Sequence, residues 1–297
     1  MTMRTKFLLL IGLLLCNVAS PQTLQGTSLP QQAEAASVKT QEKQQKTYFI
    51  ATNAQRRLVA RMRRASAGTQ VKPTPRIRSF LPIVDQENIE LKHKQIADEV
   101  LRLMPTECVK TLRNFYVRYN NPAQRGLAGK NTLILSGNVP DAEFRALLIH
   151  ELGHVFDLSD ATACLGGTSA SGKSRFRDGN DLMFNDDPSV DFYSISWANE
   201  KTKRADARAE DFVTGYAATD TFEDLAESFA YFALQNGTFR ERAKSNTALA
   251  EKYQWLSAQF PGIERNAVGQ SQWNGTVPWD ATKLAYDWQP NAYIARK

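Results

Sequence analysis

Apolar residues at helical spacing predict the first folded element, close to residue 89. In the stretch IELKHKQIADEVLRLMP they recur every three or four positions, and Pro105 ends the pattern. We therefore expect an amphipathic helix there, followed by a short helix that contains Cys108. Because His93 lies between two lysines, we expect its side chain to be exposed on the polar face of the first helix.

Two segments further along the chain have the composition of β-strands. NFYVRYN, residues 114–120, is dense in aromatic and β-branched side chains, and NTLILSGN, residues 131–138, has leucines at alternate positions. The stretch NPAQRGLAGK between them contains the proline and glycines that are typical of a loop. The sequence therefore predicts two strands joined by a loop.

Three further amphipathic segments predict helices. DAEFRALLIHELGHVFDL follows the second strand, with Asp141 as the expected N-cap, and TFEDLAESFAYFAL begins near Thr221. NTALAEKYQWLSAQF predicts another helix near the C-terminus. This mixture predicts an α+β fold for residues 81–297, interrupted at residues 159–200 by an inserted segment rich in Gly, Ser, Asp and Arg.

The first 80 residues follow a different pattern. MTMRTK precedes the apolar run FLLLIGLLL, which has signal-peptide length and is short for a membrane span, so we expect residues 1–20 to be a signal peptide. Cys16 at the end of LLLC is an alternative, less typical signal, for lipid attachment. Residues 21–80 are rich in Gln, Ser, Thr, Ala and Lys and include the basic runs QRRLVARMRR and KPTPRIR, which predicts a disordered linker or pro-segment.

Composition and charge narrow the possible functions. Hydrophobic residues make up 42% and charged residues 23%, as in soluble globular proteins, and the formal net charge of +6 is too small to indicate nucleic-acid binding. Three cysteines exclude a tetracysteine zinc site, and Cys108 and Cys164 either form one disulfide or remain two thiols. The chain has only three histidines, so a three-histidine metal site would need all of them.

Two of those histidines belong to the pattern HELGH. His150 and His154 are four residues apart, so on a helix both imidazoles lie on one face and can bind one ion. Glu151 follows the first histidine and is placed to act as a general base on a metal-bound water. Imidazole ligands and this spacing favour Zn²⁺ as the cofactor.

A catalytic zinc ion needs a third protein ligand, and two carboxylates compete for that position. Asp160 lies six residues after His154, where the metzincin pattern HExxHxxGxxH has its last ligand, but Asp157 replaces the glycine of that pattern. Glu223 and Glu227 are four residues apart on the helix predicted from Thr221, so one could bind zinc while the other hydrogen-bonds a ligating histidine. The poor placement of Asp160 favours the glutamate pair.

HELGHVFDL and VTGYAATDTFEDLAESF together resemble the gluzincin metallopeptidases, in particular the group of anthrax lethal factor and the proline-proline endopeptidases. That group has a Y-x6-E-x3-E pattern after its HExxH helix, and Tyr216, Glu223 and Glu227 match it without a gap. The resemblance covers roughly residues 131–158 and 213–232. It implies that Glu223 is the third zinc ligand, that Glu227 supports a ligating histidine, and that Tyr216 donates a hydrogen bond to the oxyanion or leaving group.

The resemblance implies a zincin-like catalytic domain and a zinc-dependent metalloendopeptidase that acts on protein or peptide, and the signal-peptide pattern at residues 1–20 predicts that it is exported. In such folds an edge strand pairs with the extended substrate, and residues 131–138 are either this edge strand or an internal strand. We expect a monomer, secreted or held in the cell envelope, whose basic arm is either a plain linker or a contact with anionic lipid or wall polymer. The alternatives are a non-catalytic surface or wall-binding protein with the same fold, and a metzincin-like peptidase that uses Asp160.

Overall fold

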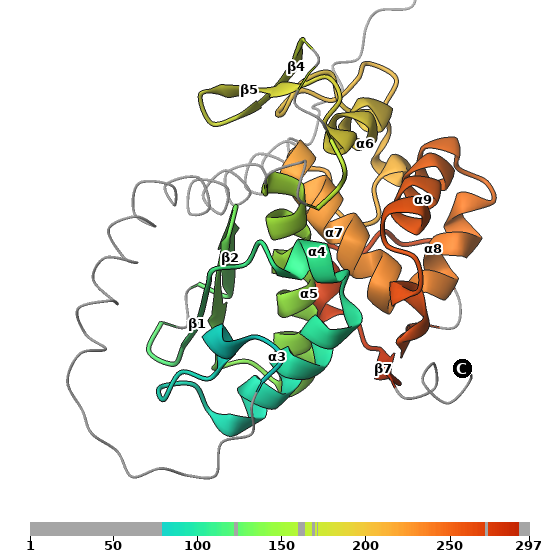
Figure 1. Ribbon diagram of the computed structural model, residues 1–297. Coiled ribbons are helices and arrows are strands. Elements are labelled where there is room, and N and C mark those ends of the chain that lie inside the picture. Colours follow the sequence, from blue (N-terminus) through green and yellow to red (C-terminus); the bar gives the residue numbers. More distant parts are fainter. Residues whose placement is uncertain are drawn as a thin grey trace, which may run out of the picture. The chain divides into compact units, whose positions relative to one another are not determined.

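The computed structural model describes residues 79–121, 124–159, 164–167, 170, 172–270 and 273–290. The chain divides into two units, Met1–Val71 and Lys72–Lys297, and every described residue lies in the second. Its fold is α+β, as the sequence predicts (Figure 1). The helices are α3 (Leu91–Leu103), α4 (Thr106–Val109), α5 (Asp141–Leu158), α6 (Pro188–Ser196), α7 (Thr221–Leu234), α8 (Asn236–Ala243) and α9 (Thr247–Gln259), and the strands are β1 (Asn114–Arg118), β2 (Gly126–Gly129), β3 (Thr132–Ser136), β4 (Lys173–Asp178), β5 (Asp181–Phe184), β6 (Ala267–Val268) and β7 (Asp287–Trp288).

A three-stranded sheet with the order β1-β3-β2 contains both predicted strands. β1 runs parallel to β3, and β2 runs antiparallel to it, with Leu127 opposite Ile134. The strand predicted at residues 131–138 is therefore the central strand, and β1 and β2 are the two edge strands. The proline and glycines of residues 121–130 predict a loop there, which is wrong for residues 126–129, because pairing with β3 gives them a strand conformation.

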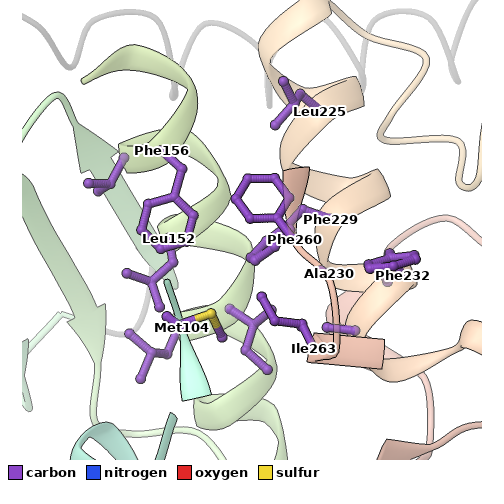
Figure 2. Packing of buried hydrophobic residues seen from close by; sticks show 14 of the residues in the cluster. Met104, Leu152, Phe156, Leu225, Phe229, Ala230, Phe232, Phe260 and Ile263 are labelled. Atoms are coloured by element: carbon purple, nitrogen blue, oxygen red, sulfur yellow. The ribbon is translucent and has the colours of Figure 1, made fainter. Parts of the chain in front are cut away.

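Helix α5 packs against the sheet on one side and against α7 on the other (Figure 1). Figure 2 shows the side chains at the second contact, where Leu152 and Phe156 of α5 lie close to Phe229 of α7. The two helices approach closely because α5 has Gly153 at the contact: a Cβ atom on this residue would lie 2.9 Å from the Cα atom of Ala226. This close contact brings the HELGH pattern next to the glutamates of α7.

The structure corrects two details of the predicted helices. His93 is fully buried, because it shares a face of α3 with Ile96 and Val100; its ring packs on Phe144 and its Nδ1 atom lies 2.9 Å from the Tyr119 hydroxyl. The prediction of an exposed His93 side chain, made from its two neighbouring lysines, is therefore wrong.

The second detail is the start of α5. Pro140 occupies the N-cap, and Asp141 is the first helical residue, without a side-chain cap hydrogen bond. Its carboxylate still lies in the first turn, where negative charge is favourable next to the helix dipole.

The inserted segment contains more regular structure than its composition indicates. β4 and β5 form an antiparallel hairpin, and α6 follows, with Asp187 as its N-cap accepting from the Ser189 amide. Cys108 and Cys164 form a disulfide, which decides between the two states left open by the sequence. The disulfide links the segment that follows α5 to the short helix α4.

Several predictions concern residues outside the described part of the chain: the signal peptide at residues 1–20, lipid attachment at Cys16, nearly all of the linker at residues 21–80, and Asp160. Among the helices of the described residues, none combines the length and the apolar character that a membrane crossing requires.

Candidate metal centre

His150 and His154 of α5 and Glu223 of α7 meet between the two helices. One ligand atom from each lies within 4.8 Å of the others, so the three side chains form a group that could hold a metal ion. All three side chains are almost completely buried. The predicted ligand set is therefore brought together in space.

The distances within this group fit a tetrahedral ion. The Nε2 atoms of His150 and His154 each lie 3.4 Å from Oε2 of Glu223. In a tetrahedral zinc site with bonds of about 2.0–2.1 Å, neighbouring ligand atoms are about 3.3–3.4 Å apart. A charge-assisted hydrogen bond would be shorter, about 2.7–2.9 Å. The two separations from Glu223 are thus compatible with ligands around one ion, and imidazole and carboxylate are donor types that zinc accepts.

Glu227 fixes the orientation of His150. Its Oε1 atom lies 2.8 Å from Nδ1 of His150, which leaves Nε2 of the ring directed to Glu223. The other carboxylate oxygen accepts hydrogen bonds from the Thr214 hydroxyl at 2.7 Å and from the Ala281 amide at 2.8 Å. This fully buried carboxylate is therefore fixed from three directions, by α5, by the segment before α7 and by the C-terminal part of the chain.

The start of α7 fixes Glu223. Asp220 is the N-cap of the helix, and its Oδ1 atom accepts hydrogen bonds from the amides of Phe222 and Glu223 at 3.1 and 3.0 Å. We did not predict this cap, although Asp directly before a helical pattern is a recognisable signal. The cap sets the backbone position from which Glu223 extends to the histidines.

Charges within the group reinforce one another. Burial alone would raise the pKa of Glu223, but the two histidines lower it well below its usual range, so the carboxylate is ionised. Burial would likewise lower the pKa of His150, and hydrogen bonds to Glu223 and Glu227 raise it instead. Glu223 is therefore an anionic carboxylate beside two imidazoles whose protonated form it favours, and a divalent cation that binds here would displace those protons, because only neutral imidazole ligates a metal.

Glu151 lies beside the ligands in a tight environment. It is 2% exposed, and a Cβ atom on Gly126 of β2 would lie 2.1 Å from its Oε1 atom, so the edge strand leaves space for this carboxylate only because it has glycine there. Burial raises the pKa of Glu151 to about 7, partly offset by the two histidines. A carboxylate with such a pKa is suited to take up and release a proton near neutral pH.

Tyr216 lies beside His150. The two rings are stacked, with centroids 6.1 Å apart, and the Tyr216 amide donates to the carbonyl of Trp279 at 2.8 Å. The sequence interpretation selected Tyr216 only through the family pattern, and the structure places its ring next to a candidate ligand.

All six site residues proposed from the sequence thus lie in one region of the structure, whereas Asp160 is outside the described residues. Sequence interpretation missed Gly126, Thr214 and the Ala281 amide. They come from separate segments: Gly126 and the Ala281 amide act through the backbone and Thr214 through its hydroxyl, so no spacing rule could have found them. Comparisons of the chain with models of protein families, with curated proteins and with solved structures found no match.

Proposed function

We propose that this protein is a zinc-dependent metalloendopeptidase with a zincin-like catalytic domain. The observation that carries the proposal is the grouping of His150, His154 and Glu223, in which both imidazole nitrogens lie at the spacing of tetrahedral zinc ligands from the Glu223 carboxylate. The resemblance of the two motifs to the gluzincins supports the same conclusion. When bound, zinc would supply Lewis-acid chemistry: it lowers the pKa of a coordinated water and polarises a carbonyl oxygen.

The remaining chemistry belongs to side chains of this chain. The Glu151 carboxylate accepts the proton of the attacking water and later delivers it to the nitrogen of the leaving amine. Its pKa of about 7 permits both transfers near neutral pH. Tyr216 donates from its hydroxyl to the oxyanion or the leaving group, and Glu227 keeps His150 in one orientation.

The position of β2 supports a peptide substrate. Within the described residues β2 pairs with β3 alone, so one of its edges has no strand partner, and this strand contains Gly126 next to Glu151. An extended peptide could add to that edge through main-chain hydrogen bonds and pass beside the candidate general base. We therefore assign the edge-strand role in substrate binding to residues 126–129 and no longer to residues 131–138.

The disulfide between Cys108 and Cys164 supports export, because structural disulfides persist mainly in oxidising compartments. We therefore keep the signal peptide at residues 1–20 as part of the proposal. The alternative, a surface or wall-binding protein without catalysis, would need no general base, and the presence of Glu151 favours the enzyme.

Cleavage of a peptide library by the zinc-loaded full chain tests the proposal. Glu151→Gln keeps the size of the side chain but cannot accept a proton, so we expect it to retain zinc and to lose cleavage by about 10²–10⁴-fold. Glu241→Gln is the matched control, because Glu241 is an exposed glutamate of α8 that pairs with Lys244. Absence of cleavage by wild type would favour the binding protein, and undiminished cleavage by Glu151→Gln would contradict the mechanism.

A second pair of variants tests the metal ligands. Glu223→Ala should weaken zinc binding far more than Asp160→Ala, as measured by competition with a chromophoric chelator. The opposite ranking would indicate a metzincin-like site that uses Asp160.

A further inference from the structure

The segment at residues 278–281 is fixed against the candidate metal centre. The carbonyls of Pro278 and Trp279 accept hydrogen bonds at 2.8 Å from the amides of Gly215 and Tyr216, in the segment that precedes α7. The next residues are fixed as well: Asp280 forms an ion pair with Arg125 beside β2, at 2.5 Å, and the Ala281 amide donates to Glu227. The backbone on either side of Trp279 is therefore held in place by contacts with residues 215–216, Arg125 and Glu227.

The indole ring of Trp279 lies at the end of a row of rings that begins at the metal centre. The Tyr216 ring is stacked on His150, and the Trp279 ring is tilted against Tyr216 with centroids 6.3 Å apart. Gly215 makes this position available, because a Cβ atom there would lie 2.6 Å from Cε3 of Trp279. The observed position of the indole ring thus requires glycine at residue 215.

In spite of this fixed backbone, Trp279 is 44% exposed. Among the large apolar side chains of the described residues, three others are exposed, namely Phe80, Leu91 and Val268. A single exposed apolar side chain is ordinary on a protein surface. Trp279 differs from an ordinary one because its position is fixed and the ring beside it stacks on a candidate zinc ligand. Such a rigid, partly exposed aromatic ring is well suited to contact a ligand.

Resting on the proposed function, we propose that Trp279 forms one wall of the subsite that receives a substrate side chain next to the scissile bond. The ring offers an apolar face and a flat shape, so the side chain it favours is a large aliphatic or aromatic one. Trp279 would act on specificity and not on the proton transfers, which are assigned to Glu151. Discrimination by an apolar subsite of this kind is about 10–200-fold.

Binding of hydroxamates measures the subsite without relying on cleavage, because the hydroxamate group itself ligates zinc. Peptide hydroxamates with glycine, leucine or phenylalanine next to the zinc-binding group are titrated calorimetrically into the zinc-loaded full chain. We expect wild type to bind the leucine and phenylalanine compounds at least about 10-fold more tightly than the glycine compound. Trp279→Ala should lose this preference, and Trp279→Phe should keep most of it.

Two further variants separate the subsite from a general effect on the fold. In Gly215→Ala the new Cβ atom displaces the indole ring while Trp279 is still present, so the preference should again decrease. Trp273→Ala is the control, because it also removes an indole ring, but one that packs on Arg242 and not on Tyr216. The preference of this variant should stay as in wild type. Circular dichroism and zinc content of each variant establish that it is folded and loaded.

The outcomes distinguish the two proposals. If wild type binds all three hydroxamates equally, or if the preference survives in Trp279→Ala, the subsite is wrong and the metal site stands. If wild type binds neither zinc nor any hydroxamate, the proposed function fails, and the subsite fails with it.

Discussion

Glu223 and Asp224 are neighbours on α7, and both are buried carboxylates, yet their surroundings differ. Asp224 accepts hydrogen bonds from Lys252 at 2.7 and 3.0 Å, from the Trp197 indole at 2.9 Å and from the Ser228 hydroxyl at 3.3 Å. Glu223 faces α5, where its Oε2 atom lies 3.4 Å from two imidazole nitrogens.

The two carboxylates differ in how far their hydrogen-bonding capacity is used within the fold. Four contacts at hydrogen-bonding distance satisfy Asp224, so its role is to join α7 to α9 and to α6 at its C-terminal end. Around Glu223 the nitrogens converge at the spacing of metal ligands, and a cation is what would satisfy all three atoms together. Two adjacent acids of one helix can thus serve structure on one face and chemistry on the other.

Lys252→Met tests the saturated face and has the largest expected effect on stability. It leaves the Asp224 carboxylate fully buried without its counter-charge, which should lower the free energy of unfolding by about 3–5 kcal/mol, measured by urea denaturation. The double variant Lys252→Met/Asp224→Leu removes both charges and should recover a large part of that loss. A loss below about 1 kcal/mol, the range of exposed pairs, would show that the pair does not support the fold.

Asp157 of α5 is a third buried carboxylate and an intermediate case. It accepts from the Tyr193 hydroxyl at 2.5 Å, and burial raises its pKa from 3.8 to about 7. The folded state therefore binds the proton more tightly than the unfolded state, so its contribution to stability is lost as pH rises from about 4 to about 7.

Asp157→Asn removes this ionisation. Relative to wild type, the variant should therefore gain up to about 3 kcal/mol of stability between pH 5 and pH 8, as measured by denaturation at both values. An equal difference between variant and wild type at the two pH values would mean that Asp157 is ionised throughout. Asp206→Asn is the control, because Asp206 is exposed and pairs with Arg204.

Glu227 gives the smallest expected effect, on the metal-binding face. Glu227→Gln keeps an oxygen for the Thr214 and Ala281 donors but weakens the contact with Nδ1 of His150. We expect zinc affinity to decrease by about 10–100-fold without loss of the fold, measured by chelator competition. If zinc affinity is unchanged, the orientation of His150 does not depend on Glu227.

The sequence predicts the local parts of this arrangement well. His150 and His154, like Glu223 and Glu227, are four residues apart on helices that the sequence predicts, so their shared faces follow from helix geometry alone. The expectation that the two helices meet rested on the need for a third ligand and on the family resemblance, since nothing in the pattern states that Gly153 will meet Ala226.

The parts that the sequence did not predict depend on long-range pairing. β2 is a strand because β3 lies beside it, and its glycine matters because Glu151 occupies the space of a side chain. His93 seemed polar from its neighbours, but its burial is decided by the face of α3 that packs on Phe144. In each case the deciding contact joins segments that are distant in the sequence.

The contrast between Glu223 and Asp224 is tested most directly by the zinc content of three full-length proteins, measured by mass spectrometry after purification with zinc and dialysis. Wild type and Asp224→Asn should each hold one zinc ion per folded chain, and Glu223→Ala should hold almost none. Where Asp224→Asn yields too little folded protein, Lys252→Met/Asp224→Leu takes its place. Full zinc content in Glu223→Ala, or its absence from wild type, would contradict the assignment of the metal centre.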